Sequence, residues 1–145
     1  MRKWILAAAL AAVFPAVAAD VGLIKVSKGS VHIQRGSEKM PATVGAGVQA
    51  SDVIVTGADG SAGITFTDNS LVSVGPGSVF AIDKYAFDST THQGEFEGNL
   101  KQGRLAAISG KMVKQSPESM KIRTPSAIMG VRGTEFVVQV DEKGK

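Results

Sequence analysis

The chain contains no cysteine, two histidines, one tryptophan and one tyrosine among its 145 residues. Without thiols it can form no disulfide, no thiolate metal site and no cysteine nucleophile. The two histidines, without cysteine, do not form a zinc-binding motif. The sequence also contains no contiguous acidic loop of the kind that binds calcium. We therefore expect neither a metal site nor a cofactor, and a stability that depends on packing.

Long hydrophobic runs are equally scarce, since the sequence has a single one, at its N-terminus. Arg2 and Lys3 precede an apolar run of 11 residues, Trp4 to Phe14, and small residues follow as far as Ala19. This order is typical of a secretory signal peptide. As a helix the run would span about 16 Å, roughly half the hydrocarbon thickness of a bilayer, which is too short for a stable membrane span. We expect residues 1–19 to be cleaved and the protein to be periplasmic or secreted.

Once this segment is removed, the chain has almost no net charge. Residues 20–145 carry 14 basic and 13 acidic side chains, scattered along the sequence. A domain that binds nucleic acid shows a basic excess gathered into a patch, so we expect no nucleic-acid partner. The length suits one domain around one hydrophobic core, and we expect this domain to span residues 20–145.

The residues that are abundant indicate strands. Fifteen Val and eight Ile stand against four Leu after Ala19, and β-branched side chains fit strands better than helices. Apolar and polar residues alternate at 31–34, 64–67 and 135–140, and turn residues recur every eight to ten positions between 52 and 82. The sequence therefore predicts an all-β fold of short strands, arranged as a two-layer roll or a solenoid-like sandwich.

Two stretches have weaker patterns. Residues 83–95 include Asp88 and His92 within a polar run, which predicts a loop that either binds a partner or is only a solvated insertion. Ser116 begins a Ser-Pro-Glu sequence that is typical of a helix start, with Ser116 as the cap, and predicts at most one helical turn.

The residues available for catalysis form no recognisable constellation. His32 lies on the polar face of a predicted strand, His92 lies in the loop, and no serine has the surroundings of a nucleophile elbow. Two carboxylates on facing walls could form a glycosidase site, and the candidates are Asp52, Asp59, Asp68, Glu95 and Glu97. Because thirteen acids supply such pairs by chance, we expect no enzymatic activity and keep a carboxylate-dependent envelope hydrolase as an alternative.

The densest motif is the run from Lys121 to Val138, in which Gly130 and Gly133 flank Arg132. The glycines allow unusual backbone angles or a close backbone approach, and the arginine offers a planar fork of five donors. Arg132, with Thr134 close by, either binds an anionic group of a ligand or partner or bonds to its own chain. The first alternative predicts a small-ligand or anion sensor, and the second predicts a structural role.

These residues resemble the most distinctive segment of the FecR domain family, named for the ferric-citrate regulator. The similar stretches are Gly103-Arg104-Leu105, Ser109-Gly110-Lys111, Pro117-Glu118, Ile122-Arg123-Thr124-Pro125, Ala127 and Gly130-Val131-Arg132-Gly133-Thr134-Glu135-Phe136. Earlier stretches such as 52–57 and 68–71 are similar as well, so the resemblance covers residues 21–140. It marks as motif residues Thr124, Pro125, Gly130, Arg132, Gly133, Thr134 and Phe136.

The resemblance implies an all-β periplasmic domain that acts by contact and not by catalysis. In the transmembrane regulators of the family, such a domain relays the state of an outer-membrane transporter to a cytoplasmic sigma factor. This sequence has no anti-sigma segment before the domain and looks more like the stand-alone exported members. We therefore expect a non-enzymatic interaction or regulatory module that binds a protein or an envelope polymer, with no iron-ligand cluster of its own.

The last residues add an expectation about self-association. Family members often continue the strand at 134–140 with a turn and another strand, whereas here only the turn-like residues 141–145 follow. The strand from Thr134 to Val140 would then lie at a sheet edge, where it could pair with a partner strand or with a second copy. The charged tail residues could instead protect this edge.

Overall fold

The computed structural model describes residue 12, residues 19–131 and residues 135–140. Nearly all of the predicted signal peptide lies outside this part of the chain, as do the motif residues Arg132, Gly133 and Thr134. No helix within the described residues is both long and apolar enough to cross a membrane.

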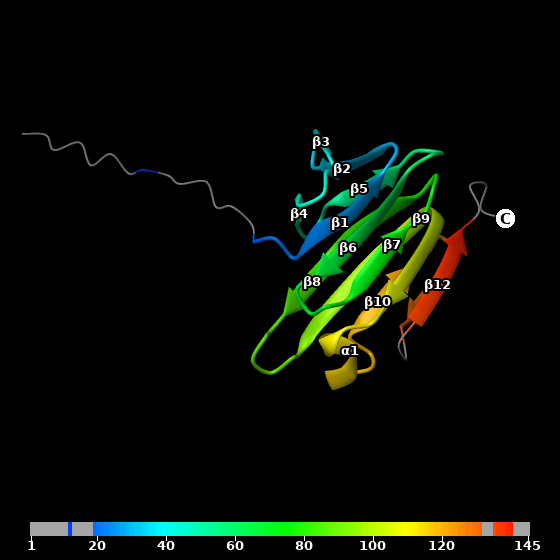
Figure 1. Ribbon diagram of the computed structural model, residues 1–145. Helices are drawn as coiled ribbons and strands as arrows, with labels where there is room; N and C mark the ends of the chain where they lie inside the picture. Colours follow the sequence, from blue (N-terminus) through cyan, green and yellow to red (C-terminus); the bar gives the residue numbers. More distant parts are fainter. Residues whose placement is uncertain (1–11, 13–18, 132–134, 141–145) are drawn as a thin grey trace, which may run out of the picture.

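The described chain forms a curled, twelve-stranded and mostly antiparallel sheet with one short helix (Figure 1). Its strands are β1 (Gly22–Lys28), β2 (Val31–Arg35), β3 (Glu38–Pro41), β4 (Gly47–Val48), β5 (Val53–Thr56), β6 (Ser61–Phe66), β7 (Leu71–Val74), β8 (Val79–Phe87), β9 (Gly94–Ile108), β10 (Met120–Arg123), β11 (Ile128–Gly130) and β12 (Glu135–Val140). Helix α1 (Lys111–Gln115) connects β9 to β10. The predicted all-β class is confirmed.

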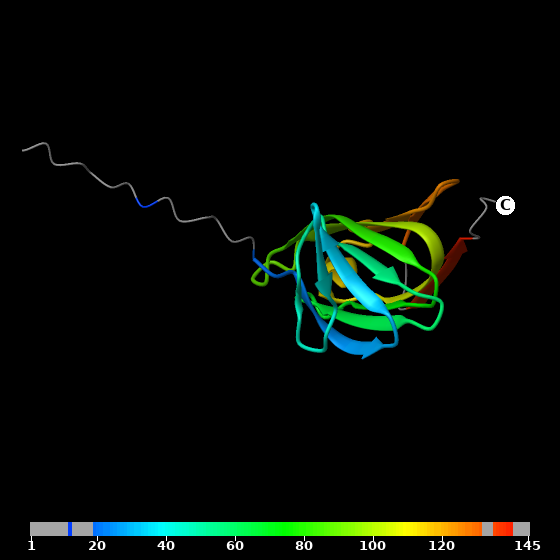
Figure 2. The ribbon, with the colours of Figure 1, turned by 90° about the horizontal axis from the view of Figure 1, so that it is seen from above.

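The sheet curls into two layers that share the long strand β9 (Figure 2). Layer A has the order β4-β1-β6-β7-β9-β12, and layer B has the order β3-β2-β5-β8-β9-β10-β11. The first half of β9 belongs to layer B, where β10 is its parallel neighbour, and the second half belongs to layer A. All the other pairings are antiparallel.

The chain passes from one layer to the other at corners rich in glycine and serine, at residues 29–30, 57–60, 75–78 and 103. Gly103 bends β9 with φ of +95°, and a β-carbon there would collide with Ser78 of the neighbouring corner. Ser78 is buried, its amide donates to Thr56 Oγ1 at 2.9 Å, and its hydroxyl accepts from the Arg104 amide at 3.0 Å. These bonds satisfy polar groups where the strand ladder is interrupted.

The core lies between the two layers and contains an aromatic cluster. The rings of Phe66 and Phe96 are 4.7 Å apart, and Tyr85 packs against each of them at 5.3 Å. The Tyr85 hydroxyl lies 2.8 Å from Thr67 Oγ1 and accepts from the Asp68 amide at 3.1 Å. Burial raises the pKa of Tyr85 to about 12, because the charged tyrosinate loses its hydration there.

Two local predictions were wrong. The expected loop at 83–95 is mostly strand, since β8 and β9 continue through it and leave only a turn at 88–93. Its polar residues face solvent from the sheet, where Lys84 and Glu95 form an ion pair of 2.9 Å. The helical turn also lies earlier than expected, because Ser116 is the C-terminal cap of α1 and does not begin a helix.

Candidate interaction surface

The structure brings Asp88 and His92 together in the turn between β8 and β9. Asp88 Oδ1 accepts from the amides of Thr90 at 2.8 Å and Thr91 at 3.2 Å, and the His92 amide donates to the Asp88 carbonyl at 2.8 Å. His92 has φ of +61°, and its ring stacks on Phe87 at 6.1 Å. Both residues thus shape the turn, and their binding role stays a prediction.

The motif residues that the structure describes belong to the β10–β11 hairpin and to β12. In the hairpin turn, which contains Pro125, Thr124 Oγ1 accepts from the Ala127 amide at 3.1 Å. Gly130 ends β11 and faces open space, whereas Phe136 of β12 is half-buried against the core. These residues form a turn and a packed strand. The predicted strand at 134–140 is confirmed over Glu135–Val140.

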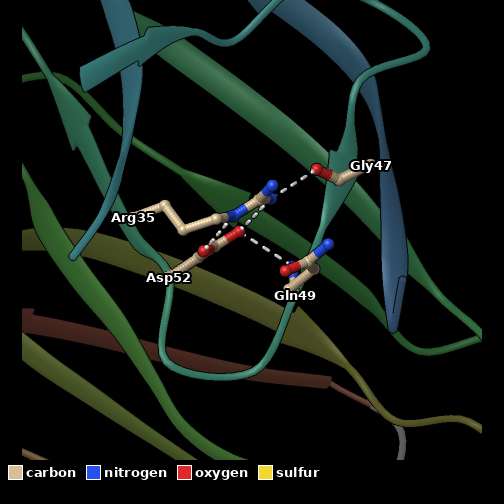
Figure 3. A network of polar contacts seen from close by, with 4 residues as sticks. All are labelled: Arg35, Gly47, Gln49 and Asp52. Atoms are coloured by element: carbon tan, nitrogen blue, oxygen red, sulfur yellow. Dashed lines mark hydrogen bonds and ion pairs between the residues drawn. The ribbon is translucent and has the colours of Figure 1, made fainter. Parts of the chain in front are cut away.

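Arg35, which belongs to no sequence motif, binds Asp52 and Gly47 of the same chain through its guanidinium group (Figure 3). We call this contact between Arg35 and Asp52 the fork. Arg35 Nε and Nη2 donate to the two carboxylate oxygens of Asp52 at 2.9 and 2.8 Å, and Nη2 also donates to the Gly47 carbonyl at 3.3 Å. The bond to Asp52 raises the pKa of Arg35. Since Arg35 ends β2 and Gly47 begins β4, the fork links layer B to the free end of layer A. Arg132 lies outside the described residues, so a sensor centred on it stays a prediction.

The five carboxylates considered for a hydrolase each contact another group of the chain. The partners are Arg35 for Asp52, Ser30 for Asp59, Ser70 for Asp68, Lys84 for Glu95 and Arg123 for Glu97. Among the residues that the structure describes, no three His, Asp or Glu side chains gather to hold a metal ion. The carboxylates are thus placed by separate structural contacts, and the hydrolase alternative stays a prediction.

The strand registers align the outward side chains of layer A in two rows. One row contains Leu23, Thr65, Leu71, Ile108 and Glu135, and the next contains Val26, Gly63, Ser73, Ala106 and Val137. Five of the seven exposed large hydrophobic side chains found among the described residues lie in these rows, with exposed fractions from 39% to 60%. They are Leu23, Val26, Leu71, Ile108 and Val137. We call these two rows the apolar outer face of layer A.

Small side chains hollow the middle of this face. Gly63, Ser73 and Ala106 lie side by side in the second row and help to line a shallow groove of about 270 Å³, with Val26 and Arg104 also at its walls. A β-carbon on Gly63 would come within 3.2 Å of the Val26 side chain, so a larger residue there would fill the groove. The groove in the apolar outer face of layer A is therefore lined mainly by small and apolar side chains, and the guanidinium group of Arg104 lies beside it.

The outer face of layer B has a different chemistry. It carries the ion pairs Lys84–Glu95 at 2.9 Å and Arg123–Glu97 at 3.9 Å. His32 lies on the same face, and burial lowers its pKa. Charged side chains gain little from leaving water, whereas exposed apolar ones gain free energy when a partner covers them. Layer A therefore presents the better candidate for an interaction surface.

The sequence matches a known protein family. The family described as FecR protein matches residues 52–145, which include β5 to β12 and the hairpin motif. No match to a curated protein or to a solved structure was found. The matched part spans more than half of the sequence and confirms the resemblance noted in the motif residues. The chain therefore belongs to the FecR family.

Proposed function

We propose that this FecR-family protein is an exported, non-enzymatic regulatory module that binds a protein partner in the periplasm through the apolar outer face of layer A. Three features support the proposal: the family membership, the signal-peptide pattern of residues 1–19, and the chemistry of this face. A module of this type transmits a signal by being bound or released, which requires a surface and no catalytic group.

The observation that carries the proposal is the concentration of exposed apolar side chains on one face of the sheet. Each of the five side chains is about half exposed, so covering each one would contribute roughly 1 kcal/mol, and covering all five about 5 kcal/mol. Association costs at least about 4 kcal/mol in lost translational and rotational freedom. The face alone therefore supports a weak and reversible contact, which suits regulation, and a tighter complex needs additional bonds.

Site-specific photo-crosslinking in cells tests this proposal. A photoreactive amino acid replaces Leu71 on the apolar outer face of layer A, and the same amino acid replaces Lys84 on the outer face of layer B as the matched control. We expect a discrete cross-linked protein from position 71 and none from position 84. Adding Ile108→Lys beside position 71 should abolish the product, because it places a charge in the same row.

The opposite pattern would contradict the proposal. If position 84 yields the discrete product and position 71 does not, the partner binds layer B. If the product from position 71 survives Ile108→Lys, the apolar row does not form the contact.

A further inference from the structure

The strands that end the two layers differ in how well their edges are protected. β3 carries Glu38, Lys39 and Pro41, and both charges and proline discourage pairing with another strand. β4 has two residues and β11 has three, which is too short for a stable ladder. β12 has six residues, EFVVQV, without lysine, proline or glycine. Of these edges, β12 is the one suited to pairing.

β12 also lies at the margin of the molecule. Among the described residues, β9 is the strand that pairs with it, and its other edge faces outward in both views (Figures 1 and 2). Val137 is 60% exposed, whereas Phe136 and Val138 turn toward the core. Within the part of the chain that the structure describes, no strand pairs with this edge, so its backbone groups form an open ladder next to the apolar outer face of layer A.

We propose that two copies of the protein associate through the edges of β12, in an antiparallel pairing centred on Val137. This goes beyond the proposed function, because the partner is a second copy and the contact is a strand edge.

The side-chain pattern selects this register. In an antiparallel pair, opposed residues point to the same face of the sheet. Centring on Val137 opposes Val137 to Val137, Phe136 to Val138, and Glu135 to Gln139 of the second copy. Moving the centre of the pairing to Phe136 or to Val138 opposes Val137 to a polar residue, either Glu135 or Gln139. The centred register therefore matches apolar with apolar residues and pairs five residues on each strand.

Charge complementarity supports the same register. Within one copy, Arg104 of β9 lies opposite Gln139 of β12, and its Nη2 donates to Gln139 Oε1 at 3.0 Å. The pairing would place Glu135 of the second copy directly beyond that glutamine. With strands about 4.8 Å apart, the Cα atoms of Arg104 and this glutamate would lie about 10 Å apart, within reach of two long side chains. The symmetry of the pair forms this contact twice.

The pairing would also join the two apolar outer faces. Because an antiparallel pair centred on one residue keeps the same face of both sheets on one side, layer A becomes continuous across the two copies. Its apolar rows then run from Val26 of one copy through both Val137 side chains to Val26 of the other.

A charge-swap experiment tests the pairing in the full-length mature protein. Sedimentation equilibrium measures the dimer dissociation constant of the native protein, Arg104→Glu, Glu135→Arg and the double variant. Each single change places like charges together twice, so we expect about a tenfold weakening, and we expect the double variant to recover most of the native affinity. Lys84→Glu, on the outer face of layer B, is the charge-matched control and should leave association unchanged.

A second variant and a second measurement keep the test independent of charge. Val137→Lys opposes two ammonium groups at the centre of the pairing and should abolish the dimer, while far-ultraviolet circular dichroism stays native because this side chain is already exposed. Hydrogen exchange at 135–140 should become slower as the native protein concentration rises.

Three results would overturn the proposal. The first is a native protein that stays monomeric at millimolar concentration. The second is a dimer that survives Val137→Lys. The third is a double charge variant that associates no better than the single variants. None of these results depends on the cross-linking from position 71, so failure of this pairing and failure of the proposed function are distinguishable.

Discussion

The contact between Arg35 and Asp52 allows us to predict how much Asp52→Asn lowers the free energy of unfolding. The Asp52 side chain is 1% exposed and accepts three hydrogen bonds, from Arg35 Nε at 2.9 Å, from Arg35 Nη2 at 2.8 Å and from the Gln49 amide at 2.8 Å. Asp52→Asn preserves the shape but replaces one acceptor oxygen by a donor nitrogen. At least one of the three bonds is lost, and a donor then faces a donor.

The magnitude depends on how well Arg35 can recover its hydration. A hydrogen bond to a charged group contributes about 1.5 to 3 kcal/mol, and breaking a fully buried ion pair costs about 3 to 5 kcal/mol. The Arg35 side chain is 31% exposed, so water can partly replace its lost partner. We therefore expect Asp52→Asn to lower the free energy of unfolding by about 2 to 3 kcal/mol. For a domain of this size that corresponds to a fall in Tm of about 10 °C.

Urea denaturation followed by circular dichroism measures this change. Asp83→Asn, which makes the same change at an exposed carboxylate of β8, is the matched control and should change the free energy of unfolding by less than about 0.5 kcal/mol. A loss of less than about 0.5 kcal/mol in Asp52→Asn itself would show that the fork contributes little to holding β2 against β4.

Two further predictions concern the corner and the core. Gly103→Ala should destabilise the fold by about 3 kcal/mol or more in urea denaturation, because φ is +95° and the new methyl group meets Ser78. Gly36→Ala, with φ of +62° and open space around it, should cost only about 1 kcal/mol, and equal losses would argue against the steric role of the corner. Tyr85 is the single tyrosine, so tyrosinate absorbance should titrate near pH 12 in the folded protein and near pH 10 in urea. Because the folded pKa is the higher one, stability from this group is complete below pH 10 and is lost as the pH rises toward 12; a folded midpoint at 10 would contradict its burial.

The fold class could be predicted because it depends on local patterns. Alternating Val and Ile residues indicated strands, and glycine-rich turns such as Gly75-Pro76-Gly77 proved to be corners between the layers. The pattern failed at 83–95, where polar residues on a solvent-facing hairpin look like a loop in the sequence. Strand and loop differ there in backbone pairing, which the sequence does not display.

The candidate surface could not be predicted because it depends on register. Leu23 and Ile108 are far apart in sequence, and only the pairings of β1, β6, β7 and β9 place them in one row. The Arg35–Asp52 fork has the same origin, since the two residues come together across β2 and the loop before β5. The C-terminal strand β12, in contrast, could be predicted because apolar and polar residues alternate along it.

Cysteine labelling in intact cells tests whether a partner covers the apolar outer face of layer A, because the native chain has no cysteine and each introduced thiol reports alone. Leu71→Cys and Val26→Cys probe the apolar outer face of layer A, and Lys84→Cys and Lys39→Cys probe the outer face of layer B. The rate of maleimide labelling in cells is compared with the rate in the purified, diluted protein. We predict that positions 71 and 26 react several times more slowly in cells, while positions 84 and 39 react equally in both. Equal rates at all four positions, or protection confined to layer B, would contradict a partner bound to the apolar outer face of layer A.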